Sequence, residues 1–436
     1  MAQKNIYFVC SECGCESLRW AGQCPSCHTW NTLKEFAVER SVSSSGSSRH
    51  KAEAVRAYKL SEIDGSPLER IKIDMPLVAE VLGGGIVQGS LLLLGGNPGV
   101  GKSTLMLALV HKTKATTLYV SGEESLQQVK DRARRISKPS SNVLLLCDTD
   151  IDVILATVLK EKAQLVVIDS IQTVIDRSIS STAGSLVQVR EIALRLQQFA
   201  KANNISFLLV GHVTKEGSIA GPKILEHIVD GVFYMESESE SLRLLRSAKN
   251  RYGSTQEIAL LEMDQNGISE VAHPEAVFLE GRASNLAGSC VTSVVEGSRV
   301  LLVEIQALVV PTVFGYPRRS AVGIHPQRLE LILAVLERRA KISLRNYDVF
   351  VKATAGLAAR EASADLAVAV SLVSAYQNKP VDDKWCVFGE VGLLGEIKQP
   401  KDKAIRTKAA KSMGMAKQVS AKNITGALEE ILMGRK

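Results

Sequence analysis

A glycine-rich segment lies between the apolar residues 91–94 and 105–110. From Gly96 its spacing is glycine, four residues, then Gly-Lys-Ser, which is the pattern of a P-loop between a strand and a helix. Glycines let successive backbone N–H groups point at one phosphate, and the following helix adds its positive end. Lys102 can reach the β- and γ-phosphates of a nucleotide, and Ser103 can ligate Mg²⁺. The predicted loop residues are Gly96, Asn97, Pro98, Gly99, Val100, Gly101, Lys102, Ser103 and Thr104.

Acidic residues follow two other apolar runs. Asp169 ends the run 165–168, which is the Walker B pattern, and its carboxylate would bind Mg²⁺ directly or through water. The run 118–120 is followed by Ser-Gly-Glu-Glu, which places Glu123 and Glu124 where ligands bind in open parallel sheets. One glutamate could orient the water that attacks the γ-phosphate, and the other could be a helix N-terminal charge. We favour Glu123 as the catalytic base and Glu124 as the structural charge.

Lys249 and Arg251 place two cations within the segment Lys-Asn-Arg-Tyr-Gly. Such cations can stabilise charge in a phosphoryl-transfer transition state, often from a neighbouring subunit. A solvated turn would have the same composition, and the spacing alone does not separate the two.

Two Cys-x-x-Cys pairs lie near the N-terminus and are separated by ten residues. Four thiolates presented by two tight turns suit tetrahedral Zn²⁺ better than disulfides or a redox pair. The predicted zinc ligands are Cys10, Cys13, Cys24 and Cys27. Trp20 and Trp30 either cover the zinc site or stack on a base, and we favour the first.

Apolar runs at 91–94, 118–120, 143–146, 165–168, 207–210 and 232–235 alternate with helical patterns such as 187–200. Continuous apolar strands separated by helices predict an α/β domain with a mostly parallel sheet. The pattern changes near residue 282, with strands expected at 300–310 and 349–353, helices at 328–340 and 362–375, and a hairpin from 387–388 and 393–397. We expect a zinc-binding module at 1–36, a Ser/Gly-rich linker at 37–59, an ATPase domain at 60–270 and an α+β domain at 271–436.

The chain of 436 residues is long enough for several domains, and its 45% hydrophobic and 23% charged residues are ordinary for a soluble protein. The net charge of +7 is compatible with a polyanionic partner. Because no apolar run approaches ~18 residues and the N-terminus lacks a signal-peptide core, we expect no membrane contact and a cytoplasmic location.

These motifs occur in an order that resembles the RadA (Sms) family of bacterial DNA repair proteins: the zinc module, the P-loop, Tyr-Val-Ser-Gly-Glu-Glu-Ser, Asp-Ser-Ile-Gln and Lys-Asn-Arg-Tyr-Gly. The family has a RecA-like ATPase core and ends in a Lon-protease-like domain. The resemblance implies ATP, Mg²⁺ and Zn²⁺ as cofactors. It implies roles for Glu123 as catalytic glutamate, for His212 as γ-phosphate sensor, and for Lys249 and Arg251 at a subunit interface.

The resemblance also implies partners. Segments 175–187 and 214–226 would meet single-stranded DNA in the centre of a hexameric ring, and a recombinase of the RecA type would be a partner. The expected activity is a DNA-dependent ATPase that translocates on single-stranded DNA and drives branch migration of recombination intermediates.

Two other functions are considered. Lon-type proteolysis needs a Ser–Lys pair, and Ser363 aligns with the serine, but Ala404 stands where the lysine is expected, with Lys401 and Lys403 nearby. We therefore expect a protease-like scaffold without protease activity. The third function is a zinc-dependent adaptor that recruits recombination proteins, against which the intact P-loop, Asp169 and Glu123 argue.

Overall fold

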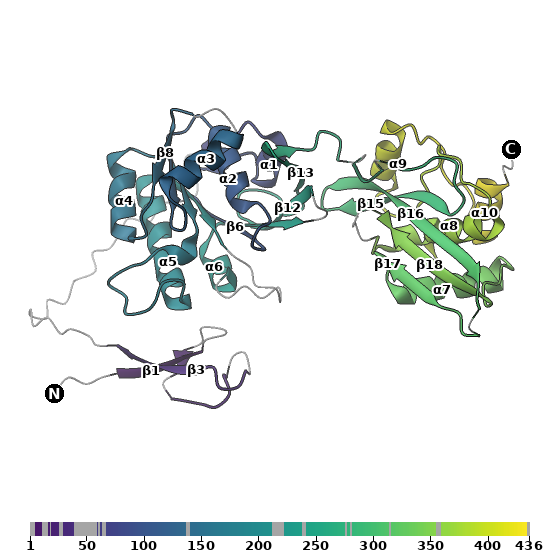
Figure 1. Ribbon diagram of the computed structural model, residues 1–436, viewed down its shortest axis with the longest axis horizontal. Coiled ribbons are helices and arrows are strands. Elements are labelled where there is room, and N and C mark those ends of the chain that lie inside the picture. The colour runs from purple at the N-terminus through teal and green to yellow at the C-terminus, as the bar shows by residue number, and fades with distance from the viewer. Residues whose placement is uncertain are drawn as a thin grey trace, which may run out of the picture. The chain divides into compact units, whose positions relative to one another are not determined.

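The computed structural model describes residues 5–10, 16–17, 19–25, 29–38, 59, 62, 67–136, 140–211, 222–237, 241–274, 277–279, 281–313, 315–354 and 359–433. The chain divides into two compact units (Figure 1). The first comprises Met1–Met235 and Ala248–Gly253, and the second comprises Glu236–Ser247 and Ser254–Lys436.

The first unit begins with a small antiparallel sheet of strand order β2-β1-β3. Its strands are β1 (Asn5–Cys10), β2 (Glu16–Ser17) and β3 (Leu33–Val38). Cys10, Cys24 and Leu33 form a buried cluster, against which Phe8 packs. Among the residues of this sheet region whose burial the structure describes, the buried apolar cluster is small, and a bound metal commonly stabilises a fold with a small core.

The large sheet has the strand order β14-β13-β12-β11-β6-β10-β9-β7-β8. The strand pairings from β8 to β11 are all parallel. The strands of this part are β6 (Leu91–Gly96), β7 (Thr117–Ser121), β8 (Val143–Leu146), β9 (Leu165–Asp169), β10 (Ser206–Val210) and β11 (Gly231–Ser237). Each predicted apolar run forms one of these strands, which confirms the mostly parallel sheet.

Helices connect these strands, as the alternating pattern predicts. They are α2 (Lys102–His111), α3 (Leu126–Ile136), α4 (Ile151–Lys160), α5 (Leu186–Asn203) and α6 (Pro222–Ile228). The short strand β4 (Arg70–Ile71), the helix α1 (Pro76–Val81) and the short strand β5 (Ile86–Val87) precede β6. Leu91 and Leu93 pack in one cluster with α4 and α5. Leu92 and Leu94, on the opposite face of β6, are equally buried. Both faces of β6 are thus covered, which is why the strand is apolar throughout.

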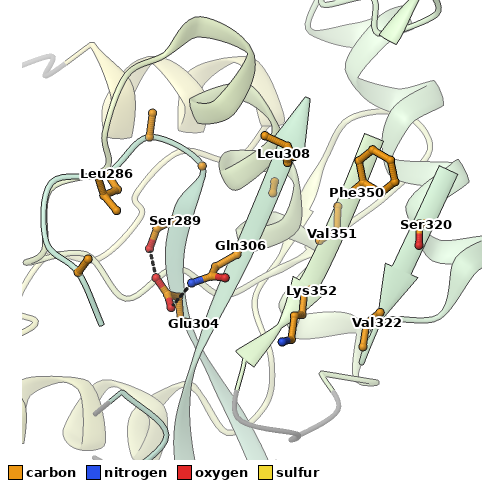
Figure 2. A pocket seen from close by; sticks show the side chains of 14 residues that line it. Leu286, Ser289, Glu304, Gln306, Leu308, Ser320, Val322, Phe350, Val351 and Lys352 are labelled. Atoms are coloured by element: carbon orange, nitrogen blue, oxygen red, sulfur yellow. Dashed lines mark hydrogen bonds between the residues drawn. The ribbon is translucent and has the colours of Figure 1, made fainter. Parts of the chain in front are cut away.

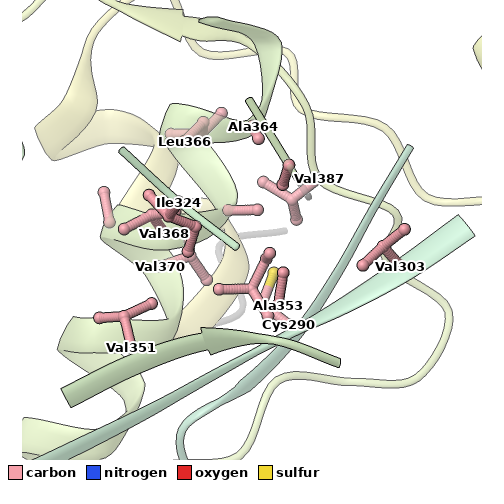
Figure 3. Close-up of a cluster of buried hydrophobic side chains, with 14 of the residues drawn as sticks. Cys290, Val303, Ile324, Val351, Ala353, Ala364, Leu366, Val368, Val370 and Val387 are labelled. Carbon is pink, nitrogen blue, oxygen red and sulfur yellow. The ribbon is translucent and has the colours of Figure 1, made fainter. Parts of the chain in front are cut away.

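The second unit contains a four-stranded sheet of order β15-β16-β18-β17, with strands β15 (Ser289–Glu296), β16 (Arg299–Pro311), β17 (Arg319–Val322) and β18 (Tyr347–Ala353). Its helices are α7 (Pro326–Arg339), α8 (Asp365–Gln377), α9 (Lys403–Ser412) and α10 (Ile424–Leu432). Figure 3 shows Leu366, Val368 and Val370 of α8 facing Cys290, Val303 and Val351 of the sheet. The expected α+β composition of this region is therefore observed.

The remaining strands are β12 (Leu242–Asn250), β13 (Ile258–Asp264), β14 (Gly267–Glu270) and the paired β19 (Glu390–Val391) and β20 (Ile397–Lys398). Residues of β12 and β13 belong to the same core as α8, so the compact second unit begins before residue 270. The domain limits expected from the sequence remain predictions.

Two expectations from the sequence are corrected here. The predicted hairpin of residues 387–388 and 393–397 is wrong in its limits, because the pairing joins Glu390–Val391 to Ile397–Lys398. The exposed Leu393 and Leu394 lie in its turn. The helix expected at 362–375 begins with a 3₁₀ turn at Ala362–Ala364 before α8.

Across the described ranges, every helix is too short or too polar to cross a membrane.

Candidate nucleotide-binding and catalytic site

The predicted P-loop forms the turn between β6 and α2. Gly101 precedes the helix in a left-handed conformation with φ of 108°, which a residue with a Cβ rarely adopts. A Cβ at Gly96 would lie 2.5 Å from the carbonyl oxygen of Met235 on the neighbouring strand β11. These two glycines therefore give the loop its turn and its close fit to the sheet.

Lys102 is the first residue of α2, and only 4% of it is exposed. Its Nζ donates to the carbonyl oxygens of Gly96 and Asn97 at 2.7 and 2.9 Å, so the ammonium lies across the loop. Burial lowers the pKa of Lys102, and the charges of Asp169 and Glu123 partly offset this. The ammonium thus lies within electrostatic range of Asp169, the predicted Mg²⁺ ligand, and of Glu123, the predicted catalytic base.

Asp169 ends β9, and its neighbour in the sheet is Ser121 at the end of β7. The buried Tyr119 donates its hydroxyl to Oδ2 of Asp169 at 2.5 Å. Burial, followed by the charge of Asp169, raises the pKa of Tyr119 well above its ordinary value, so the phenol stays a donor. The tyrosine therefore fixes the carboxylate that, with Ser103, would hold Mg²⁺.

The two adjacent glutamates have different partners. Ser170, which is completely buried, donates its hydroxyl to Oε1 of Glu123 at 2.8 Å. Glu124 forms an ion pair with Arg132 of α3. A Cβ at Gly122 would lie 1.8 Å from Oγ1 of Thr173, so the end of β7 closely approaches the 3₁₀ turn Ile171–Thr173. Glu123 is thus held by the residue next to Asp169, whereas Glu124 is bound to the helix α3.

Lys249 and Arg251 contact groups of their own unit. Nζ of Lys249 donates to the carbonyl oxygens of Glu226 and Val229 at 2.5 and 2.8 Å, at the C-terminal end of α6. Burial and the charge of Arg251 lower the pKa of Lys249. Arg251 pairs with the buried Asp230 at 3.0 Å, and about half of its side chain stays exposed. The structure thus brings both cations to the end of α6.

Of the two segments predicted to meet DNA, residues 175–187 are described in full. Residues 176–181 fold back on α5, because the completely buried Gln188 binds three of their carbonyl groups. Its Oε1 also accepts from the backbone N–H of Asp176 at 3.0 Å. His212 and residues 214–221 lie outside the described residues.

The predicted zinc ligands are described in part. Cys10 and Cys24 are completely buried, and the thiol of Cys10 donates to Oγ1 of Thr32 at 3.1 Å. Buried soft thiols beside a hydroxyl suit a zinc site, in which the hydroxyl would donate to the thiolate. Cys13 and Cys27 lie outside the described residues.

A separate pocket of about 480 Å³ lies in the second unit, over β15–β18 (Figure 2). Its lining includes Leu286, Leu308, Phe350 and Lys352. Its one buried carboxylate, Glu304, accepts hydrogen bonds from Ser289 and Gln306. None of the residues predicted for catalysis lines this pocket.

Two regions of the chain match known protein families, and the chain is similar to proteins of known name over nearly its whole length. Residues 8–35 match the family described as rubredoxin metal binding domain, and residues 59–218 match the AAA domain family. DNA repair protein RadA of Listeria monocytogenes is 44% identical over 98% of this chain and 94% of its own length. RadA of Bacillus subtilis is 42% identical, with 98% and 94% covered.

The chain belongs to the RadA family of DNA repair proteins. A KaiC-like protein of Pyrococcus horikoshii, of known structure, is 21% identical, with 47% of this chain and all of that chain covered and a TM-score of 0.40. The predicted RadA resemblance and fold class are confirmed, with a zinc ribbon and a RecA-like P-loop core. Membership implies an ATPase domain that binds nucleotide, and the ribbon indicates zinc.

Proposed function

We propose that this RadA-family chain is a DNA-dependent ATPase of homologous recombination that translocates on single-stranded DNA and promotes branch migration. Subunits would form a hexameric ring around the strand and act with a recombinase of the RecA type. The observation that carries the ATPase part is the grouping of Lys102, Asp169 and Glu123 at the P-loop edge of the sheet. The family supplies the DNA substrate, since its members are DNA repair proteins.

In this proposal residues 96–104 bind ATP, and Ser103 and Asp169 hold Mg²⁺. When bound, Mg²⁺ would neutralise charge on the phosphate oxygens. Lys102 would leave the two loop carbonyls and donate to the β- and γ-phosphates. Glu123, oriented by Ser170, would accept a proton from the attacking water.

Lys249 and Arg251 would act on the γ-phosphate of a neighbouring subunit. Arg251 is half exposed, whereas Lys249 must first break its two bonds to the end of α6. We propose that His212 senses the γ-phosphate, and that segments 175–187 and 214–226 contact the DNA. Gln188 would give the first of these segments a fixed base from which to move with nucleotide state.

The test is ATP hydrolysis with and without single-stranded DNA by the wild type, Lys102→Ala, Lys249→Ala, Glu123→Gln and Glu124→Gln. We expect DNA to stimulate the wild type, and the two lysine variants to be inactive though folded. Glu123→Gln should lose about 10²- to 10⁴-fold in kcat, the range for a general base. Its matched neighbour Glu124→Gln should stay near wild type. If DNA changes nothing and Lys249→Ala equals wild type, the recombination assignment fails.

A protease function is the second candidate. Ser363 is buried, and its hydroxyl has no hydrogen-bond partner in the described part of the chain, so no base is seen to activate it. The buried cation Arg406 is bound by Asp402 and by Glu361, which is two residues before Ser363 in the chain. An arginine in two ion pairs is a poor proton acceptor. We therefore propose that the Lon-like domain serves assembly or DNA binding, and peptidase activity that is lost in Ser363→Ala would contradict this.

An adaptor function makes a different prediction. A protein that only recruits partners through its zinc module would complement a repair-deficient strain equally well with Lys102→Ala. A motor would not, because that substitution removes the phosphate-binding ammonium. Survival of DNA-damaged cells that carry the variant decides between the two.

A further inference from the structure

The zinc module, residues 1–36, exposes two large aromatic rings. Trp20 is 59% exposed and Trp30 is 68% exposed. More than half of each tryptophan is therefore open to solvent, whether or not the rest of the ring covers the zinc site, the role we favoured from the sequence. No other large apolar side chain is exposed among the module residues whose burial the structure describes. Exposed pairs of this kind commonly mark a binding site.

The two rings flank one glycine. A Cβ built at Gly22 would lie 3.6 Å from Cζ3 of Trp30 and 3.9 Å from Cη2 of Trp20. The backbone here is fixed, because the N–H of Asn31 donates to the carbonyl oxygen of Gly22 at 2.7 Å and Gln23 pairs with Trp30. Both rings therefore lie beside Gly22, which has no side chain of its own.

The surroundings of the rings favour a nucleic acid over an apolar protein pocket. Of the four residues next to the tryptophans in sequence, Arg19, Thr29 and Asn31 are polar and exposed, whereas Ala21 is partly buried. Protein hot spots are usually ringed by contacts that exclude water. Single-stranded nucleic acids are instead bound by aromatic rings that stack on bases and by cations that follow the phosphates. Arg19 supplies such a cation.

The third tryptophan is used differently. Trp385 is 7% exposed, and Nζ of Lys417 lies 5.7 Å from the centre of its ring. It belongs to the core of the second unit and cannot receive a base. Of the three indoles, only Trp20 and Trp30 can report a ligand by direct contact.

We propose that Trp20 and Trp30 form a stacking platform for unpaired bases of single-stranded DNA. The choice of DNA rests on the proposed function, whereas the stacking mode rests on the exposure and placement of the rings. Contact with bases and not only with phosphates separates this site from a basic groove. Because every base has a π-face, the platform would bind without sequence preference.

The first experiment uses the intrinsic tryptophan fluorescence of the zinc-loaded full-length protein without nucleotide. We expect oligothymidylate to quench the emission strongly. An abasic oligonucleotide of equal length, with the same phosphates, should quench it little. The double variant Trp20→Phe, Trp30→Phe keeps only Trp385 and should show no quenching. Equal quenching by both oligonucleotides, or none by oligothymidylate, overturns the proposal, and the second result would favour a protein partner for the rings.

The second experiment measures affinity for labelled oligothymidylate by fluorescence anisotropy. Each Trp→Ala change should raise Kd about 10-fold, the loss expected from one stacked base. Trp→Leu, which keeps apolar area but cannot stack, should resemble Trp→Ala, and Trp→Phe should retain most of the affinity. Leucine variants that bind like the wild type would overturn stacking. Zinc content, measured with a chromogenic chelator, verifies that each module is intact.

DNA stimulation of ATP hydrolysis, measured on the same wild-type preparation, keeps this inference separate from the proposed function. If DNA stimulates hydrolysis but does not quench the emission, the stacking platform is wrong and the motor stands. If DNA quenches the emission but does not stimulate hydrolysis, the platform stands and the motor is wrong.

Discussion

Ser170→Ala tests whether Glu123 is a positioned base. The change removes the hydroxyl that donates to Oε1 of Glu123 at 2.8 Å and leaves the P-loop untouched. A hydrogen bond to a charged group contributes about 1.5–3 kcal/mol. We take the lower end, because Glu123 is exposed and water can replace part of the bond. About 1.5 kcal/mol corresponds to roughly a 10-fold fall in kcat.

The assay is steady-state ATP hydrolysis in the presence of single-stranded DNA. KM for ATP should stay near wild type, because Lys102 and the loop glycines are unchanged. Ser125→Ala is the matched control, since its hydroxyl bonds only to Gln128 in the described structure and lies just beyond the two glutamates. It should hydrolyse ATP at the wild-type rate.

A double variant provides the refutation. If Ser170 acts through Glu123, adding Ser170→Ala to Glu123→Gln should cost almost nothing further, because coupled residues are not additive. A further 10-fold loss in the double variant would show that Ser170 acts by another route. An unchanged kcat in Ser170→Ala alone would show that the hydrogen bond does not orient the base.

Three other predictions follow from buried groups. Arg406→Leu leaves the carboxylates of Glu361 and Asp402, which are each about 30% exposed, without their arginine partner. We therefore expect the free energy of unfolding to fall by about 3 kcal/mol and Tm to fall by about 6–12 °C in calorimetry. An unchanged Tm would contradict this. Burial raises the pKa of the Cys386 thiol from 9.0 to about 12. The unfolded chain therefore loses that proton first, and the free energy of unfolding should fall as pH rises from 9.0 toward 12, less steeply in Cys386→Ala, as urea titrations would show. Gly96→Ala brings a Cβ to 2.5 Å from a carbonyl oxygen and should abolish binding of a fluorescent ATP analogue; retained binding would show that β11 can move aside.

The fold could be predicted where local pattern decides it. Each apolar run predicted between residues 91 and 235 forms a strand. Strands of a sheet that is covered on both faces are apolar throughout, so they can be predicted without knowing which strands they pair with. The hairpin near residue 390 failed for the opposite reason. Leu393 and Leu394 look like strand residues, yet they lie exposed in the turn, and the pairing is set by Gly392 and Gly395 around it. Apolar character alone does not set register in so short a pair.

The site shows the same division. The P-loop could be predicted because its residues are contiguous, so the spacing of its glycines, lysine and serine can be read directly from the sequence. The partners that distinguish Glu123 from Glu124 are not adjacent to them in sequence. Ser170 lies 47 positions from Glu123, and Arg132 lies eight positions from Glu124. Tyr119 begins the Tyr-Val-Ser-Gly-Glu-Glu-Ser segment, but no role was predicted for it, because its partner Asp169 lies 50 positions along the chain. Such contacts follow from the order of β7 and β9 in the sheet, in which Ser121 faces Asp169. The sequence nevertheless contained a clue to these contacts. Two adjacent parallel strands bring together the residues that follow their C-terminal ends. The polar side chains at 119–124 and 169–173 were therefore candidates for direct contact.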